Sequence, residues 1–411
     1  MIGGLIMKKF LMAVIMLLSV MNIACAEPER NLSTGVNEFC WKYFATLDKT
    51  ENIFYSPYGI HAALSILANG ASGDTRQEIL HALSVDNVEN LNDEHKRFSE
   101  LVLKTYDDKN FFKEFNLLLV KKNIFGRGLD KKFQRVVTDV YKSDVRKADF
   151  SDNLDGERQN ITRWVSDKTQ GFIPNYYPLA FPGAMTDLLN VVCFKGEWAM
   201  PFNERDTSLQ GFRNYDGSID EYPMMSKVFK DAIPYRADEK FKGIILPYSA
   251  GAAMYLILPA DDNALNVAEL WNAESFSYRA DFIDGLRNSP AFDGEVIVRM
   301  PRSGMNFETI LVDSLQAMGM EKSFSNDAEF FNIVNGEQLK IGNAKHCARI
   351  KIDEQGTEAA AVTEITMLEA TATPDFKPPR RVYFIADRPF LFVVRDLESN
   401  VTLFAGVFNK L

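Results

Sequence analysis

The four histidines are the residues of this chain that acid–base or metal chemistry would use first. They are His61, His81, His95 and His346, and none has a neighbour at metal-ligand spacing. His61 falls in an apolar helical stretch, whereas His81 and His95 lie in polar surroundings. No G-x-S-x-G, H-E-x-x-H, phosphate-binding or dinucleotide-binding motif is present. We therefore expect no metal, no cofactor and no enzyme activity. A Ser/His/Asp triad scattered along the chain, as in a hydrolase, is the alternative.

The segment after Ile350 has an alternation that suggests a different chemistry. It begins as a strand and passes through Gly356 into small residues. At period two, one face carries no charge: Thr357, Ala359, Ala361, Thr363, Ile365 and Met367. Glu358 and Glu364 fall on the other face, so this segment can be exposed and later join a sheet without burying an unpaired carboxylate. A helical turn, which alanine and glutamate favour, and an ordinary alanine-rich loop are the alternatives.

The elements around this segment predict one α+β domain from Glu27 to Leu411, because no repeat or composition break divides the chain. Asn52–Pro57 is expected to be a short strand that runs into a core helix, with Ser56 as its cap and Pro57 at its first position. Further helices are expected over Glu157–Thr169 and Phe307–Met318. Strands are expected over Val191–Phe194, Gly243–Tyr248, Met254–Pro259, Glu295–Pro301, Val382–Ala386, Phe390–Val394 and Val401–Phe408.

Several segments resemble those of the serpin family in their sequence, order and spacing. The resemblance covers nearly the whole chain after residue 26. Glu354–Ala361 is similar to the reactive-loop hinge of inhibitory serpins. The other matching segments are Asn52–Pro57, Asn190–Trp198 with Phe202, Thr207 and Phe212 after it, Pro223–Met225, Leu246–Tyr248 and Asp387–Phe390. The resemblance implies helices packed around three β-sheets, with an exposed reactive-centre loop, about 354–381, that can insert into the central sheet.

The resemblance also implies a mechanism and roles for residues. A target serine protease cuts the loop and forms an acyl-enzyme, and loop insertion then distorts the protease, so the chain acts as a suicide substrate. The hinge would comprise Glu354, Gly356, Thr357, Glu358, Ala359, Ala360, Ala361, Val362 and Thr363. Trp198, Arg302 and Glu354 would lie where the loop enters the sheet, with Glu354 and Arg302 as a surface ion pair.

The resemblance further implies that Ser56, Asn190 and His346 form a polar cluster that holds the sheet strands together. An ordinary buried histidine is the alternative for His346. Gly59 departs from the family pattern, in which many members have serine. The loop between the hinge and Pro389 is also several residues longer than is typical. A non-inhibitory serpin, acting as a carrier or chaperone, is the alternative function.

Two ways of locating the cleaved bond disagree. Counting forward from Gly356 predicts Ala370–Thr371, with Ala372–Thr373 next. Counting back from Pro389 gives the stretch from Phe376 to Pro378. We prefer the forward count, because the length measured from the hinge determines how far the protease is carried.

The small residue Ala370 before the predicted bond fits a shallow specificity pocket, so we expect an elastase-like target. Arg380 or Arg381 would imply a trypsin-like protease, but both lie far from the hinge and beside prolines.

The first 26 residues are predicted to be a signal peptide. Lys8 and Lys9 precede an apolar run, Phe10–Met21, that is too short for a membrane span, and Ala24-Cys25-Ala26 supplies a cleavage pattern with the cut after Ala26. This short leader is typical of bacteria and predicts a secreted, extracellular or periplasmic protein. Lipid anchoring at Cys25 is the alternative.

The remaining composition limits the partners. The net charge of -10 makes nucleic acid a poor partner, and we expect a monomer. Cys40, Cys193 and Cys347 are an odd number in apolar segments, so we expect buried free thiols. Glycosylation sequons begin at Asn31, Asn160 and Asn400, and they matter only in a eukaryotic secretory route.

Overall fold

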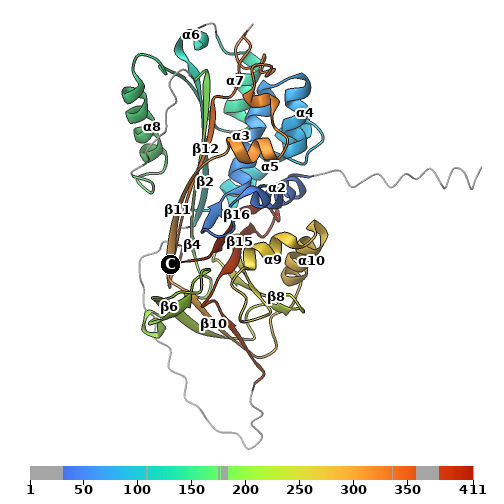
Figure 1. Ribbon diagram of the computed structural model, residues 1–411, viewed down its shortest axis with the longest axis vertical. Coiled ribbons are helices and arrows are strands. Elements are labelled where there is room, and N and C mark those ends of the chain that lie inside the picture. Colours follow the sequence, from blue (N-terminus) through green and yellow to red (C-terminus); the bar gives the residue numbers. More distant parts are fainter. Residues whose placement is uncertain are drawn as a thin grey trace, which may run out of the picture.

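The computed structural model describes residues 31–107, 110–126, 128–174, 176, 184–335, 337–357 and 379–410. Within them the strands form three sheets, surrounded by helices (Figure 1). The predicted signal peptide, hinge residues 358–363 and the predicted cleavage site Ala370–Thr371 lie outside the described residues. The prediction of an α+β fold built on three sheets is confirmed.

The central sheet is the tall one in Figure 1, and its strand order is β11-β12-β13-β4-β2-β3. Its strands are β2 (Phe111–Lys121), β3 (Asp144–Ala148), β4 (Thr186–Glu197), β11 (Ser303–Ile310), β12 (Asn343–Ile352) and β13 (Gly356–Thr357). β12 pairs directly with β4, in parallel, from Asn343↔Asp187 to Arg349↔Cys193. Beyond that ladder the two-residue strand β13 lies between them.

The other two sheets occupy the lower half of the molecule in Figure 1. One has the order β1-β16-β15-β9-β8-β7: β1 (Ile53–Tyr55), β7 (Tyr235–Ala237), β8 (Phe241–Pro247), β9 (Ala252–Pro259), β15 (Phe390–Asp396) and β16 (Thr402–Phe408). The other has the order β14-β10-β6-β5: β5 (Ser208–Arg213), β6 (Ile219–Lys230), β10 (Glu295–Pro301) and β14 (Arg381–Ile385). The predicted strands agree with these bounds to within a few residues, although β4 is much longer than predicted.

The helices cover the central sheet unequally. α8 (Leu154–Lys168) packs on one face over a small core that includes Trp164, Val191 and Cys347. The main core lies on the other face, under α2 (Leu32–Thr46), α3 (Pro57–Gly70), α4 (Gly73–Ala82), α5 (Val88–Thr105) and α7 (Lys131–Asp139). The remaining helices are α6 (Lys122–Phe125), α9 (Val267–Ala273), α10 (Phe276–Arg287), α11 (Val312–Ala317), η1 (Glu204–Asp206) and η2 (Lys322–Phe324).

The helix predicted over Phe307–Met318 is wrong in its first part. Ser303–Ile310 is strand β11, and α11 is limited to Val312–Ala317. β11 pairs antiparallel with β12, for example Phe307 with Ala348, and after the buried Ser303 exposed and partly buried residues alternate along it. Strand pairing therefore overrides an apolar spacing that also fits a helix.

The structure corrects the expected surroundings of His95 and confirms that the three cysteines are buried free thiols. His95 was predicted in polar surroundings, but it is buried, with its Nε2 3.3 Å from Nδ1 of His61. Cys40, Cys193 and Cys347 are buried free cysteines, and burial raises the pKa of Cys40 to about 12. Within the described ranges, no group of three or more His, Cys, Asp or Glu side chains is placed to hold a metal ion. The same residues contain no helix with the length and apolar character to cross a membrane.

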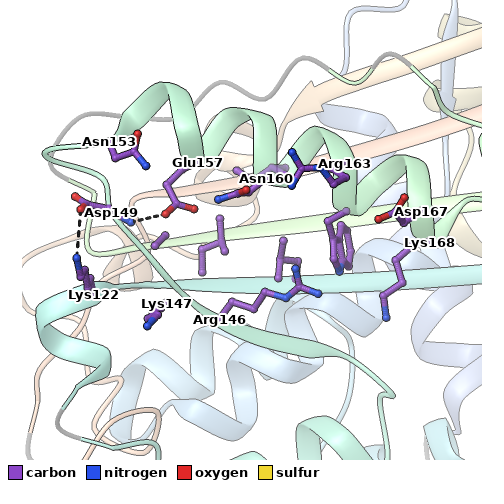
Figure 2. A pocket seen from close by; sticks show the side chains of 15 residues that line it. Lys122, Arg146, Lys147, Asp149, Asn153, Glu157, Asn160, Arg163, Asp167 and Lys168 are labelled. Carbon is purple, nitrogen blue, oxygen red and sulfur yellow. Dashed lines mark hydrogen bonds and ion pairs between the residues drawn. The ribbon is translucent and has the colours of Figure 1, made fainter.

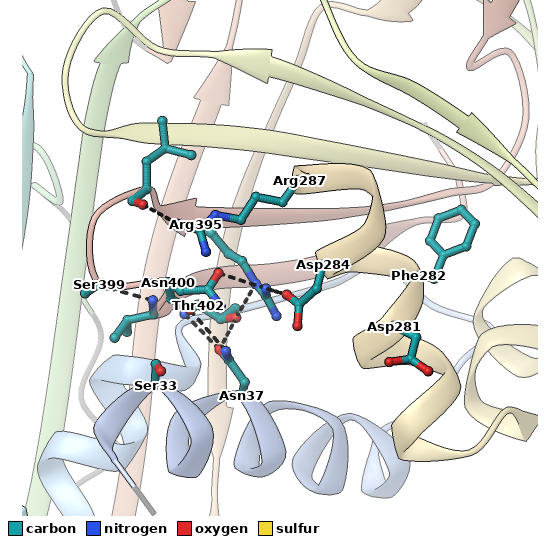
Figure 3. A network of polar contacts seen from close by, with 12 residues as sticks. Ser33, Asn37, Asp281, Phe282, Asp284, Arg287, Arg395, Ser399, Asn400 and Thr402 are labelled. Atoms are coloured by element: carbon teal, nitrogen blue, oxygen red, sulfur yellow. Dashed lines mark hydrogen bonds and ion pairs between the residues drawn. The ribbon is translucent and has the colours of Figure 1, made fainter. Parts of the chain in front are cut away.

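A buried polar network joins α2 and α10 to β15 and β16 (Figure 3). Arg395 donates from Nη1 to Asp284 at 3.0 Å and to the side chain of Asn400 at 3.1 Å. Asn37 accepts from the Thr402 hydroxyl at 2.6 Å. Both Asn400 and Thr402 of one predicted sequon are thus engaged inside the fold.

Candidate functional site

The first part of the site is the sheet mouth, which we define as Trp198, Arg302, Glu354 and Gly356. β12 ends at Ile352, and the chain reverses through a turn in which Asp353 accepts from the amides of Gln355 and Gly356 at 3.0 and 3.2 Å. β13 then runs antiparallel to both of its neighbours. The start of the predicted hinge thus already forms a strand between β12 and β4.

Gly356 has to be glycine at this place. Its φ is 149°, and a Cβ atom there would lie 2.1 Å from the carbonyl oxygen of Gly196 and 2.7 Å from Cα of Glu197. Both obstacles are backbone atoms of β4, which cannot rotate away as a side chain could. The glycine therefore permits the close approach between the two strands.

Glu354 makes the predicted ion pair, but it is not a surface pair. Arg302 donates from Nε to both carboxylate oxygens at 3.1 and 3.0 Å, and Thr207 donates to Oε1 at 2.6 Å. The Glu354 side chain is 4% exposed, whereas Arg302 is 44% exposed. Burial opposes ionisation of Glu354, but the hydrogen bonds from Arg302 and Thr207 outweigh it and lower the pKa of its carboxyl. Since the carboxylate is buried, losing its partner costs more than losing a surface pair.

Trp198 closes the mouth from the β4 side. Its indole Nε1 donates to the carbonyl of Asp353 at 3.0 Å, and its amide donates to the carbonyl of Gln355 at 2.8 Å. Its ring stacks on Tyr248, with centroids 4.5 Å apart. Trp198 therefore holds the turn before β13 from two directions.

The second part of the site is the seam cluster, which we define as Ser56, Asn116, Asn190 and His346. Asn190 on β4 and His346 on β12 are direct register partners in the parallel ladder, with His346 Nδ1 2.7 Å from Asn190 Oδ1. The amide of Ser56 at the start of α3 donates to His346 Nε2 at 3.0 Å. Asn190 donates in turn to Asn116 on β2 at 2.8 Å. The cluster therefore links three strands and a helix at the closed part of the sheet.

These contacts determine the protonation of His346. A backbone N–H can only donate, so Nε2 accepts and Nδ1 carries the proton that is donated to Asn190. Burial lowers the pKa of His346 to about 3, and the ring is neutral at neutral pH. The seam is thus held by neutral hydrogen bonds, unlike the mouth.

Ser56 is the cap of α3, as predicted. Its hydroxyl accepts from the amide of Gly59 at 3.0 Å and donates to the carbonyl of Leu403 on β16 at 2.6 Å. A Cβ atom on Gly59 would lie 2.4 Å from Val192 and 2.7 Å from Oδ1 of Asn190. α3 therefore packs tightly against β4 at Gly59, and this arrangement leaves no room for the serine that many family members have there.

α8 and the segment after it brace the outer face of the sheet. Arg349 on β12 donates to the carbonyl of Phe172, and the Lys345 ammonium lies 5.1 Å from the ring centre of Tyr176. A cavity of about 590 Å³ lies between α8 and the strands β2 and β3 (Figure 2). Trp164 contributes to its apolar lining, and charged side chains surround it, with Lys122 paired to Asp149 at 3.8 Å. No residue of the mouth or the seam cluster lines it.

The structure thus groups the predicted residues into two sites on the same pair of strands. Asn116 and Glu114, both on β2 beside Asn190, were not predicted as site residues from the sequence. A polar residue in the apolar run that follows Phe115 was the available signal for Asn116. Glu114 gave no signal, because a glutamate in an alternating strand is usually solvated.

Comparison with known proteins identifies the family. The sequence matches the family model described as Serpin (serine protease inhibitor) over residues 34–411. The chain belongs to the serpin family. Serpins in general bind target serine proteases and act as inhibitors rather than as enzymes, although the family has non-inhibitory members.

Relatives of this serpin come from different organisms. Serpin-Z1C of Triticum aestivum is 32% identical over 86% of this chain and 89% of its own, and Iripin-1 of Ixodes ricinus is 28% identical over 95% and 97%. Among solved structures, native tengpin, a thermophilic serpin, has a TM-score of 0.80 at 25% identity, covering 93% of this chain and 96% of its own. Human thyroxine-binding globulin, solved in complex with thyroxine, has a TM-score of 0.77 at 24% identity, covering 92% of this chain and 98% of its own, and shows the same fold.

Proposed function

We propose that this serpin inhibits a serine protease as a suicide substrate, as a monomer in a one-to-one complex. The protease serine forms an ester with the residue before the cut while the peptide C–N bond breaks and the new amino terminus leaves. The loop then joins the central sheet before water hydrolyses the ester. The observation that carries this proposal is β13, which already lies between β4 and β12 and is antiparallel to both.

Continuing the register of β13 gives the length of strand that the sheet can accept. Thr357 pairs with Gly196 on β4 and with Ile352 on β12. At the same register, Met367 would reach Thr186, where β4 begins, and Thr366 would reach Asn343, where β12 begins. The sheet therefore has room for a strand from Gly356 to Met367, in exchange for the parallel β4–β12 ladder.

The same register places the loop's two faces in suitable surroundings. Thr363 would lie opposite both Asn190 and His346, so insertion must separate this hydrogen-bonded pair. Ala361 would lie opposite Val192 and Ala348, which both belong to the main core. The uncharged face of the loop would thus enter the core without a charge.

The two glutamates of the inserted segment would meet lysines on the α8 side of the sheet. Glu358 would lie opposite Lys195 on β4 and Lys351 on β12, and Glu364 would lie opposite Lys345. Opposite charges directly across strands stabilise a sheet by roughly 0.2–1 kcal/mol per pair. This charge pattern supports the proposed register, because a slip by one residue would turn both glutamates into the core.

The register supports Ala370–Thr371 as the cleaved bond. Ala370 lies three residues beyond Met367, so full insertion would carry the bound protease just past the far end of β4. A cut between Phe376 and Pro378 would leave a long tether instead. We propose an elastase-like target, because alanine suits a shallow pocket.

Incubation with an elastase and with trypsin tests the proposal. We expect an SDS-stable complex with the elastase and a released peptide that begins at Thr371, read by mass spectrometry. A peptide that begins at Arg381 or Val382 would sink the elastase assignment. Cleavage without any stable complex would favour the carrier alternative, and turnover of ester substrates would favour a hydrolase.

We further propose that the protein is exported after a cut behind Ala26. The support is the leader pattern around Lys8 and Lys9, an expectation from sequence alone. The mass of the mature protein tests it, since a lipid-anchored form would begin at Cys25 and carry added acyl mass.

A further inference from the structure

A second cavity, of about 190 Å³, lies against β2, and no residue of the sheet mouth is among the residues that line it. It is bounded by α3, α5, β2 and the residues that follow α7. Its lining is rich in aromatic rings: Tyr58, Phe98, Phe112 and Tyr141. Neighbouring rings pack closely, with centroids 4.5 Å apart for Tyr58 and Phe98 and 5.6 Å apart for Tyr58 and Phe112.

Glu114 contributes the carboxylate of this lining. It accepts hydrogen bonds from the side-chain amides of Asn116 and, at 3.3 Å, Asn190. In the part of the chain that the structure describes, no lysine, arginine or histidine forms an ion pair with it. Burial raises the pKa of Glu114 to about 8, and no cation close by compensates for the charge that its ionised form would carry.

We propose that this cavity binds an organic cation, an ammonium group carried on a small apolar body. The ammonium would pair with the Glu114 carboxylate, and the aromatic lining would hold the apolar body and stabilise the charge through ring faces. The volume suits a molecule with one ring or a short branched chain. An aromatic lining around one uncompensated carboxylate is complementary to a cation in both shape and charge.

The other ionisable groups around the cavity do not satisfy this carboxylate. Burial raises the pKa values of Tyr58 and Tyr141 and lowers that of His95, so all three are neutral at neutral pH. The Lys113 ammonium lies 4.6 Å from the ring centre of Phe111 and 3.4 Å from Gln170, away from Glu114. Lys142, also in the lining, forms no ion pair with Glu114 in the described structure.

The site adjoins the seam cluster, because the Asn190 side chain that donates to Glu114 also accepts from His346. Its lining nevertheless contains no residue of the sheet mouth, and the proposal involves no protease. Binding can therefore be measured on the intact, uncleaved protein, and its outcome does not depend on whether the protein inhibits a protease.

Calorimetric titration with benzyltrimethylammonium, whose charge does not change with pH, tests the proposal. We expect saturable binding that tightens as the pH rises from 6 to 9, because the cation prefers ionised Glu114. Phenylmethanesulfonate, an anion of similar size, should bind at least tenfold more weakly. Thermal unfolding should shift upward with the cation and not with the anion.

Two variants test separately the charge of Glu114 and the volume of the cavity. Glu114→Gln keeps the shape and should weaken binding of the cation at least tenfold and remove its pH dependence. Ser99→Phe keeps Glu114 but fills part of the cavity, and it should also abolish binding. The proposal is overturned if the wild-type protein does not bind the cation, if the sulfonate binds equally well, or if either variant binds it as the wild type does.

Discussion

The sheet mouth and the seam cluster lie on the same two strands, yet one is open and the other is closed. At the mouth, β13 already separates β4 from β12, and an ion pair between Glu354 and Arg302 anchors the turn. At the seam, Asn190 and His346 pair directly. The difference teaches that the proposed insertion would have a starting point at the mouth, but would have to break a neutral, fully buried hydrogen bond at the seam to proceed.

Thr357→Arg should have the largest effect, because an arginine at the start of the inserted strand would oppose insertion by desolvation of its charge. We expect normal cleavage by the target protease and complete loss of the SDS-stable complex, measured by gel and by residual protease activity. Asp375→Arg is the matched control, since position 375 lies beyond the predicted cut and should leave inhibition intact. A stable complex with Thr357→Arg would show that the mouth is not where insertion begins.

His346→Ala tests the seam and should be the next largest effect. It leaves the Ser56 amide and Asn190 Oδ1 unpaired in the core, which should lower the free energy of unfolding by about 3 kcal/mol. We expect a lower unfolding midpoint of the uncleaved protein in urea. His81→Ala is the matched control, because His81 is exposed and should change little.

The seam also predicts a pH dependence. His346 has a folded pKa of about 3, below the ordinary value of 6.5. Its contribution to stability is therefore complete above about pH 6.5 and is lost as the pH falls toward 3. The depressed pKa values of buried His61 and His95 act in the same direction, so the difference between wild type and His346→Gln isolates the seam. An unchanged acid slope in that variant would contradict the neutral assignment.

These two regions differed in how far the sequence could predict them. Ser56 and Pro57 were predictable as a helix start, because capping is a local pattern. Asn190 and His346 lie 156 positions apart, and only the family resemblance suggested that they belong together. A contact between residues so far apart in sequence depends on how the whole sheet folds, so no local sequence pattern can predict it.

Elsewhere the sequence misled or gave no signal. The apolar spacing after Phe307 fits a helix as well as a strand, and pairing with β12 decided for the strand. His95 has polar neighbours in sequence, but α5 turns it into the core beside His61. Glu114 lies in an alternating strand, where a carboxylate usually faces water, and the packing of α5 over β2 encloses it only in part.

Arg302→Ala tests the mouth and should lower the free energy of unfolding by about 1–3 kcal/mol. This loss should be smaller than that of the seam variant, because Thr207 still donates to the buried Glu354 carboxylate. The folded pKa of Glu354 is lowered, so the pair stabilises above pH 4.5 and its contribution disappears as the pH falls through the folded pKa. Urea unfolding at pH 7 and pH 3 measures this, and the difference between variant and wild type should shrink at pH 3. Arg97→Ala, at an exposed i,i+3 pair, is the control, and an equal loss in both variants would refute a special role for Arg302.

The smallest expected effect concerns the charges that would meet only after insertion. In the uncleaved protein Lys345 is 5% exposed and lies over the ring of Tyr176. If the register of β13 continues, Glu364 arrives beside Lys345, and a double-mutant cycle with Lys345→Gln and Glu364→Gln should give about 0.5 kcal/mol of coupling in the cleaved form. The uncleaved form should show none, because β4 then occupies the place beside β12. Glu369→Gln, beyond the start of β4, is the matched control; coupling of Lys345 to residue 369 rather than to 364 would mean that the inserted strand takes a different register.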